Sequence, residues 1–229
     1  FSYENKISIA AVRLGFVDVK RNIQPMTSSD GKHSVVFNGE IYNYKKYRKK
    51  IAKKFSYEFK SNGDTEVLLA MLMFYGERAI EKLDGIFSFC YFDSVKNKTI
   101  ISRDKCGVKP LYYTTKNSIF YFASDCDALL KNLGKQKINK EAIYSYLING
   151  YINYPLSPWE GISKLYPGHY LLIEGGSYLI KKFASNKTRF NFEKSQLKEE
   201  IFKVIKKQTD YDKEISVSCS GGIDSSIIA

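Results

Sequence analysis

The chain has 229 residues, 44% hydrophobic and 26% charged, which fits a globular protein with one core, or with one domain and the start of a second. No apolar run approaches the roughly 18 residues that span a bilayer, and the N-terminus lacks a signal-peptide pattern, so we expect no membrane partner and a cytoplasmic location. The net charge of +12 comes from lysines interspersed with acids, which indicates a solvated surface rather than a nucleic-acid partner.

The N-terminal part of the chain is predicted to be rich in strands. Residues 7–19 and 33–43 carry the β-branched and aromatic side chains that favour strands. The lysine-rich run 45–54 predicts the solvated face of a short helix, because Ile51 and Phe55 recur beside it at helical spacing.

A second helix is predicted to begin at Asp64, which we place at the N-cap position, with Thr65 and Glu66 in the first turn. The helix is predicted to be amphipathic. Its apolar positions fall on one face, made of Val67, Leu68, Met71, Leu72 and Tyr75.

Further strands are predicted after Gly85, separated by short polar turns, and this pattern favours antiparallel sheets. Residues 141–149 predict a short helix, and a hairpin is expected to turn at Gly175 and Gly176. Two stacked sheets with helices outside them would bury so many apolar strands. The four strands after Gly85 are expected at residues 86–93, 99–104, 110–115 and 118–124.

The composition becomes polar between residues 184 and 194, where we place a domain boundary. The first domain is assigned to 1–185 and the second begins at 193. An amphipathic helix is predicted at 193–208, followed by a strand at 215–217, a glycine loop and a helix start. The change from antiparallel strands to helix–strand–helix predicts two domains of different class. The helix at 193–208 is expected to turn Leu197, Ile201, Val204 and Ile205 inward.

The glycine loop has the sequence SGGIDSS at residues 220–226. Adjacent glycines at a strand–helix junction let the backbone approach a polyanion, and the helix start offers free N–H groups to phosphate. Asp224 can help to hold a magnesium ion on that phosphate. A plain strand–turn–helix connection is the alternative for a bare Gly-Gly pair, but the complete string resembles the PP-loop of ATP pyrophosphatases.

A second constellation lies in the first domain. Arg13, Glu40 and Asp64 supply one guanidinium and two carboxylates, which match the α-carboxylate and α-ammonium of a free amino acid such as glutamine. The Asn38 side chain and the Gly39 N–H can form an oxyanion hole for amide hydrolysis. An isolated Asn-Gly pair would more often be a hairpin turn, so the hypothesis depends on its companions.

Eight ordered motifs together resemble the glutamine-hydrolysing asparagine synthetases, over nearly all of residues 7–229. They are VRLGFVDV with QPM, FNGEIYNYKKYR, SNGDTEVLL, LDGIFSFCYFD, RDKCGVKPLYY, FASDCDALL, GISKLYPGHYLL and SGGIDSS.

The resemblance implies a fold of class α+β. A four-layer αββα N-terminal-nucleophile sandwich would be followed by the start of an α/β PP-loop ATP pyrophosphatase domain. It also implies an ATP-driven amidation of aspartate to asparagine, with release of AMP and pyrophosphate, in which a glutaminase supplies ammonia through an internal tunnel. ATP and Mg²⁺ are the implied cofactors.

The resemblance also implies roles for individual residues. Arg13 would bind the glutamine α-carboxylate, Asn38 and Gly39 would stabilise the tetrahedral intermediate, and Gly39, Glu40 and Asp64 would position the α-amine. Residues from Leu14 to Val17 would line the glutamine pocket. The ATP site would comprise Cys219, Ser220, Gly221, Gly222, Asp224, Ser225 and Ser226, with Asp224 also directed at magnesium.

The nucleophile of this family is an N-terminal cysteine whose own α-amine serves as base, yet this chain begins at Phe1. We expect that cysteine to precede Phe1, and the chain as given to be inactive because it also stops just after the glycine loop. None of the four internal cysteines has a free α-amine, and their spacing argues against zinc or disulfides. They are Cys90, Cys106, Cys126 and Cys219.

Three hypotheses remain open at this point. The first is an asparagine synthetase, or a related amidotransferase that acts on another carboxylate. The second is a ligase of the same superfamily without glutaminase activity, which the intact Asn38, Gly39, Glu40 and Asp64 disfavour. The third is a regulatory binding module. The expected partners are glutamine, ATP and aspartate or another carboxylate, and a homodimer is compatible with the sequence.

Overall fold

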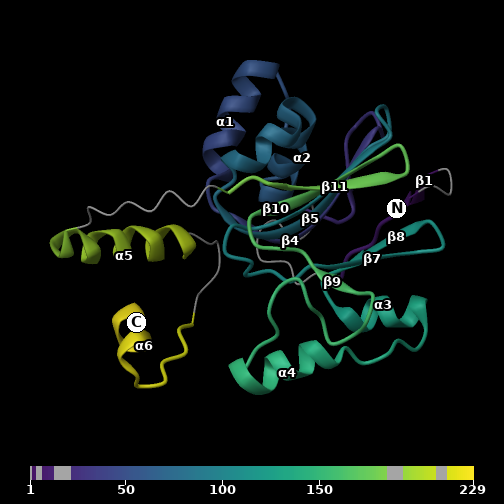
Figure 1. The fold of residues 1–229 in the computed structure, drawn as a ribbon. Coiled ribbons are helices and arrows are strands. Elements are labelled where there is room, and N and C mark those ends of the chain that lie inside the picture. Colours follow the sequence, from purple (N-terminus) through teal and green to yellow (C-terminus); the bar gives the residue numbers. More distant parts are fainter. Residues whose placement is uncertain (1, 4–6, 13–21, 185–192, 210–215) are drawn as a thin grey trace.

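The computed structural model of the chain describes residues 2–3, 7–12, 22–184, 193–209 and 216–229 (Figure 1). Its elements in chain order are β1 (Ser2–Tyr3), β2 (Ile7–Ser8), β3 (Met26–Thr27), β4 (His33–Ile41), α1 (Tyr44–Phe55), α2 (Asp64–Tyr75), the 3-10 helix η1 (Gly76–Lys82), β5 (Gly85–Asp93), β6 (Lys98–Arg103), β7 (Tyr112–Lys116), β8 (Ile119–Ala123), α3 (Cys126–Leu133), α4 (Lys140–Asn149), β9 (Ser163–Lys164), β10 (His169–Glu174), β11 (Ser177–Lys182), α5 (Lys194–Gln208) and α6 (Ile223–Ile228).

Two antiparallel sheets form the centre of the molecule. The larger sheet has six strands in the order β11-β10-β6-β5-β4-β3, and the smaller has the order β8-β7-β9. The predicted antiparallel strands after Gly85 and the hairpin at Gly175 and Gly176 are confirmed. The chain is a mixed α/β protein with antiparallel sheets, as expected from strands whose apolar residues alternate between two faces.

Three clusters of buried side chains separate the layers. One lies between the six-stranded sheet and helices α1 and α2, and it contains Val35, Phe37 and Leu68. A second lies on the other face of that sheet, where Val36 and Cys90 share a cluster with Leu111, which directly precedes β7, and with Tyr113 of β7. The third joins the smaller sheet to α3. Figure 1 shows this order, with α1 and α2 above the sheets and α3 and α4 below them.

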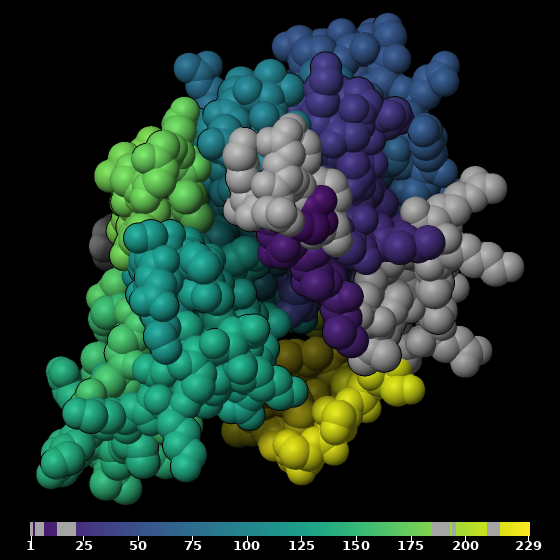
Figure 2. All heavy atoms as spheres, turned by 90° about the vertical axis from the view of Figure 1, so that its right-hand side faces the viewer, coloured from purple at the N-terminus to yellow at the C-terminus, as the bar shows by residue number. Residues whose placement is uncertain are grey.

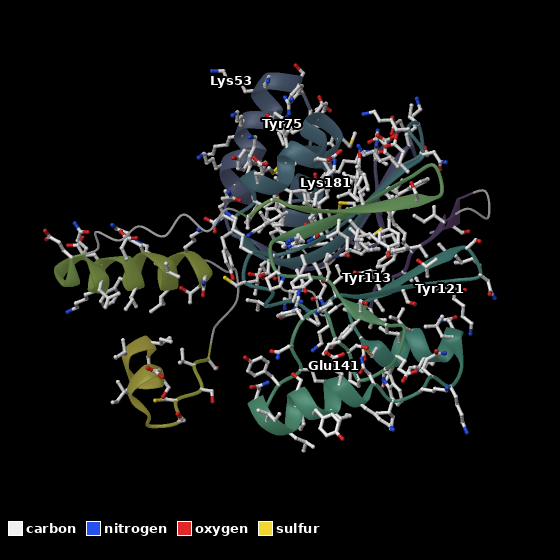
Figure 3. All side chains as sticks on the ribbon, viewed as in Figure 1. Lys53, Tyr75, Tyr113, Tyr121, Glu141 and Lys181 are labelled. Carbon is white, nitrogen blue, oxygen red and sulfur yellow. The ribbon has the colours of Figure 1, made fainter. Side chains whose placement is uncertain are left out.

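The two sheets also touch at their edges. Tyr178 of β11 packs against Tyr113 of β7 and Phe120 of β8, with ring centroids 6.1 and 5.3 Å apart. In the space-filling view the green β10–β11 hairpin and the teal β7–β8 hairpin lie side by side (Figure 2), and Tyr113 is labelled in Figure 3. The sheets therefore form one continuous body.

Helix α1 follows its sequence pattern, whereas α2 is buried beyond the single apolar face that the sequence predicted. Helix α1 buries Tyr47 and Ile51 and leaves most of its lysines outside, which confirms the solvated face predicted from the charge run. Helix α2 is buried from Thr65 to Leu72. It ends at Gly76, whose φ of +57° is a conformation that favours glycine.

Several sequence-based expectations need correction. The N-cap of α2 is Gly63, and Asp64 is the first helical residue, because the Asp64 carboxylate bonds to another segment instead of capping its own helix. Among the described residues of 7–19, only Ile7 and Ser8 are in a strand. The strand expected at 215–217 is absent from the described residues 216–220.

The helix predicted at 193–208 forms as α5, but the prediction that its apolar face is buried is wrong for two residues. Leu197 is 49% exposed and Val204 is 47% exposed. Lys207 of this helix pairs with Asp84, which directly precedes β5, and lies over the ring of Tyr42, which directly follows β4. The predicted domain division at 185 and 193 stays a prediction.

A network of ion pairs and hydrogen bonds around the half-buried Glu77 joins η1 to the six-stranded sheet. Glu77 accepts from Lys98 Nζ over 2.6 Å, from the Tyr170 hydroxyl over 2.7 Å and from Lys181 Nζ over 3.3 Å. Lys181 is labelled in Figure 3. Burial alone would raise the pKa of Glu77, but the hydrogen bonds from these partners and the charge of Lys98 outweigh it and lower the pKa to about 2.

We therefore expect Glu77 to make stability depend on acid pH. A carboxyl group whose folded pKa is depressed stabilises the fold above its unfolded pKa, and that contribution is lost as pH falls from about 4.5 toward about 2. Urea unfolding at pH 7 and pH 3 should show a smaller pH-dependent loss in Glu77→Gln than in the parent. An equal loss in both proteins would contradict the assignment.

No helix in the described part of the chain is both long and apolar enough to cross a bilayer.

Candidate functional site

Three predicted site residues lie together at the far end of β4. The Asn38 side chain is exposed, and Gly39 and Glu40 are half-buried. Because side chains alternate along a strand, Asn38 and Glu40 share a face with Val36, and Val36 belongs to the cluster between the two sheets. The predicted amide and the first predicted carboxylate therefore open toward the space between the sheets.

The edge of β4 that faces away from β5 carries a row of N–H groups. Phe37 N–H donates to Gln24 Oε1 over 2.6 Å, and Ile41 N–H donates to Asp64 Oδ2 over 3.1 Å. Alternate N–H groups of a strand point to the same side. The N–H of Gly39 therefore points to the same edge, between the Gln24 side chain and the Asp64 carboxylate.

The pairing with β5 supports this direction. Gly39 lies opposite Phe87, whose N–H donates to Asp104 Oδ2 over 3.2 Å and whose carbonyl accepts from the Asp104 N–H over 2.8 Å. Both groups of Phe87 thus point away from β4, and the pair is a non-hydrogen-bonded one. Gly39 has φ +144°, and an added Cβ would lie 2.7 Å from Phe87 Cα, so only glycine fits there.

The start of α2 is fixed by a buried acid. Glu66 accepts from Lys60 N–H over 2.9 Å, from Ser61 N–H over 2.6 Å and from the Ser61 hydroxyl over 2.7 Å. Arg48 of α1 donates to the Ser61 carbonyl over 2.6 Å. These bonds hold the loop before α2, so that Asp64 reaches Ile41 N–H. The structure therefore brings Asp64 to the strand end that carries Asn38, Gly39 and Glu40.

The RDKCGVKP motif begins at the end of β6 and holds the part of β5 that lies opposite Gly39. Both Arg103 and Asp104 are buried. The carboxylate of Asp104 accepts four backbone N–H groups, and the guanidinium of Arg103 donates to three carbonyls. The four N–H groups belong to Phe87, Cys106, Val108 and Lys109, and the three carbonyls to Gly107, Lys109 and Leu165.

Tyr42 extends the acidic surroundings of the site. Burial raises the pKa of its phenol, and the charges of Glu40, Asp84 and Asp104 raise it further. The Tyr42 N–H donates to the Asp84 carbonyl over 2.8 Å. The Tyr42 phenol, directly after the strand end, therefore lies near three acidic side chains.

Some predicted residues cannot be placed. Arg13, Leu14 and Val17 lie outside the described residues, so the guanidinium and the pocket wall remain predictions. Sequence reasoning missed Gln24, Glu66 and Asp104 as supports of the site. The only signal was their presence in family-like motifs, because their bonds join segments far apart in the chain.

The second predicted site is an exposed loop. Gly221 has φ +79° with nothing within 4 Å of an added Cβ, and Gly222 is the N-cap of α6. Ser220 Oγ lies 3.1 Å from Ser225 Oγ, and Ser225 Oγ donates to the Gly222 carbonyl over 3.1 Å. A hydrogen bond from the Gly221 backbone, together with hydrogen bonds to the hydroxyls of Ser225 and Ser226, lowers the pKa of the Cys219 thiol.

All four cysteines are free thiols in the structure. Cys90 is buried in the cluster between the sheets, and burial raises the pKa of its thiol. Cys126 is also buried, whereas Cys106 and Cys219 are exposed. Within the described part of the chain, no three His, Cys, Asp or Glu side chains are grouped to hold a metal ion.

Two antiparallel sheets with an amide, an outward N–H and two carboxylates at one strand end form a scaffold that suits a small molecule carrying an ammonium group and a carbonyl. Comparison with known families gives the specific result. Residues 1–184 match the model of a glutamine amidotransferase domain, and the chain therefore belongs to this class II glutamine amidotransferase family.

Individual relatives are similar over the whole chain. Identity is 32% to "Asparagine synthetase [glutamine-hydrolyzing] 1" of Bacillus subtilis, covering 100% of this chain and 37% of that protein. It is 34% to a putative asparagine synthetase of Methanocaldococcus jannaschii, covering 97% and 40%, and 28% to "Amidase chry2" of Gibberella zeae, covering 100% and 35%. The chain thus spans well under half the length of these relatives.

Solved structures resemble the fold. Glutamine phosphoribosylpyrophosphate amidotransferase from B. subtilis matches with a TM-score of 0.50 and 18% identity, covering 72% of this chain and 32% of that one. This likeness concerns the arrangement of sheets and helices alone.

Proposed function

We propose that the chain binds glutamine at the end of β4 and belongs to an enzyme that hydrolyses it to supply ammonia. The observation that carries this proposal is the bond from Ile41 N–H to Asp64 Oδ2, 3.1 Å long. It joins the acid of α2 to the strand end that holds Asn38, Gly39 and Glu40. Membership of the glutamine amidotransferase family supports the same substrate.

Each group has a separate task in the proposed reaction. Glu40 and Asp64 hold the α-ammonium by charge, and Arg13 holds the α-carboxylate. The Asn38 side-chain N–H and the Gly39 N–H stabilise the oxyanion that forms when a thiolate attacks the side-chain amide. In the proposed N-terminal-nucleophile sandwich the thiolate and its amine base come from an N-terminal cysteine.

ATP and magnesium are proposed for the loop at residues 220–226. The positive φ of Gly221 and the open space around its Cα fit close approach of a phosphate, and the neighbouring hydroxyls and N–H groups are suitable donors. Ser220, Gly222, Ser225 and Ser226 would hold the pyrophosphate, and Asp224 the magnesium ion. The carboxylate would attack the α-phosphorus of ATP and form an acyl-adenylate with release of pyrophosphate, and ammonia would then displace AMP to form the amide.

Aspartate is the proposed acceptor, because relatives similar to this chain carry the name asparagine synthetase. An amidotransferase for another carboxylate is the alternative. It is favoured by the similarity to "Amidase chry2" over the whole chain.

The test uses the natural protein that contains these residues, with L-glutamine labelled with ¹⁵N in its side-chain amide, ATP, magnesium and a panel of acids. Mass spectrometry should find ¹⁵N in asparagine when aspartate is present, together with AMP. Label in another amide would select the alternative acceptor. Absence of both labelled product and glutamate would refute the proposal.

A further inference from the structure

A short segment beside the proposed glutamine site contacts both of its halves. Residues 22–25 run between the start of α2 and the edge of β4 that faces away from β5. The half-buried Gln24 accepts the Phe37 N–H through Oε1 over 2.6 Å. The fully buried Asn22 packs against Gly63, where an added Cβ would lie 2.8 Å from Asn22 Oδ1.

Each contact lies one residue from a proposed catalytic or binding group. Phe37 directly precedes Asn38, and Gly63 directly precedes Asp64. Nothing in the sequence pattern requires a glutamine at position 24, because the segment is not a regular element there. A glutamine side chain replaces a neighbouring strand at this point, since β3 pairs with β4 only at Ser34 and Val35.

We infer that Gln24 is a positioning residue for the oxyanion hole, and this inference rests on the proposed function. Phe37, Gly39 and Ile41 present their N–H groups to the same edge of β4. Gln24 accepts the N–H of Phe37 and Asp64 accepts the N–H of Ile41. The N–H of Gly39, between them, remains directed at the substrate. Fixing the strand on both sides of Gly39 sets the direction of its N–H and of the Asn38 side chain.

The two acceptors, Asp64 and Gln24, therefore have different roles. Asp64 carries a charge and binds the α-ammonium as well as Ile41 N–H, so it acts on glutamine in the ground state. Gln24 is neutral and acts through Phe37 on groups that meet the oxyanion. An interaction realised only in the transition state changes kcat, whereas one present in both states changes KM.

The experiment measures glutamate release from L-glutamine by the natural protein that contains this chain. Gln24→Met preserves length and removes the acceptor, and we expect kcat to fall about tenfold, the limit for one hydrogen bond, with KM changed less than about twofold. Gln24→Glu keeps an acceptor for Phe37 N–H and should retain a kcat at least about three times that of Gln24→Met.

Two controls separate positioning from folding. Ammonia-dependent synthesis should be unchanged in Gln24→Met, and Gln196→Met, at an exposed glutamine of α5, should leave glutamate release unchanged. An unchanged kcat in Gln24→Met would overturn the inference, as would parallel loss of glutamate release and ammonia-dependent synthesis. Absence of glutamate release from the parent protein would instead refute the proposed function.

Discussion

Replacing Asp64 by Asn should weaken glutamine use by about ten- to a hundredfold, mainly through KM, because a hydrogen bond to a charged partner contributes about 1.5–3 kcal/mol. The side-chain carbonyl of asparagine can still accept from Ile41 N–H, which Asp64 Oδ2 now does over 3.1 Å. The variant therefore removes the charge and preserves the contact with β4. Steady-state glutamate release by the natural protein measures the effect.

The ammonia-dependent reaction provides the internal comparison for this variant. Synthesis from free ammonia does not use glutamine, so its rate should remain within about twofold of the parent. The substitution changes only how tightly glutamine binds, in the ground state and the transition state alike. Glu58→Gln removes the same charge from an exposed position and should alter neither activity. Equal loss of both activities in Asp64→Asn would show that Asp64 has a structural role only.

The largest loss of stability is expected for Asp104→Ala. The Asp104 side chain is buried and accepts four backbone N–H groups. A buried N–H donor left without its acceptor costs about 1–3 kcal/mol, so the loss of four such bonds is a large part of the 5–15 kcal/mol that stabilises a typical domain. Because one of these four bonds comes from the N–H of Phe87, which lies opposite Gly39, the loss should also loosen the proposed site.

Equilibrium urea unfolding followed by circular dichroism measures this loss. Asp104→Asn keeps one carbonyl acceptor and should be destabilised less than Asp104→Ala. Glu160→Ala, at an exposed acid, should change the free energy of unfolding by less than about 0.5 kcal/mol. A loss below about 1 kcal/mol in Asp104→Ala would mean that water replaces the carboxylate at little cost.

Local patterns predicted much of the fold. Runs of β-branched and aromatic residues separated by short polar turns predicted β4, β5 and β6, and the lysine run predicted α1. The packing of α3 against the smaller sheet was harder to predict from the sequence. This helix is short, and its burial depends on Ile162 from a distant loop. The strand expected at 215–217 did not form in its described part, because β-branched residues are a weak signal without a neighbouring strand.

The residue types of the proposed site could be predicted from the sequence, but the residues that support them could not. Asn38, Gly39, Glu40 and Asp64 were chosen because their chemistry matches glutamine. The role of Gln24 depends on one bond across 13 positions, and that of Asp104 on one bond across 17. Such contacts between distant segments leave no periodic signal in a single sequence.

The exposed apolar side chains of α5 illustrate a related limit. Periodicity identified the helix and its apolar face correctly, but the direction of that face depends on what packs against it. In the described part of the chain, Lys207 of α5 contacts Asp84 and Tyr42, while Leu197 and Val204 remain exposed. Amphipathicity predicts that a face can be buried, and tertiary contacts decide whether it is.

The most direct test of the account is a titration of the ¹⁵N-labelled chain with L-glutamine, followed through the backbone amide signals. The account predicts saturable shifts of the Gly39 and Ile41 amides at the end of β4 and of Asp64 at the start of α2, and no such shifts with D-glutamine. Saturable shifts confined to other elements, with these three amides unmoved, would contradict it.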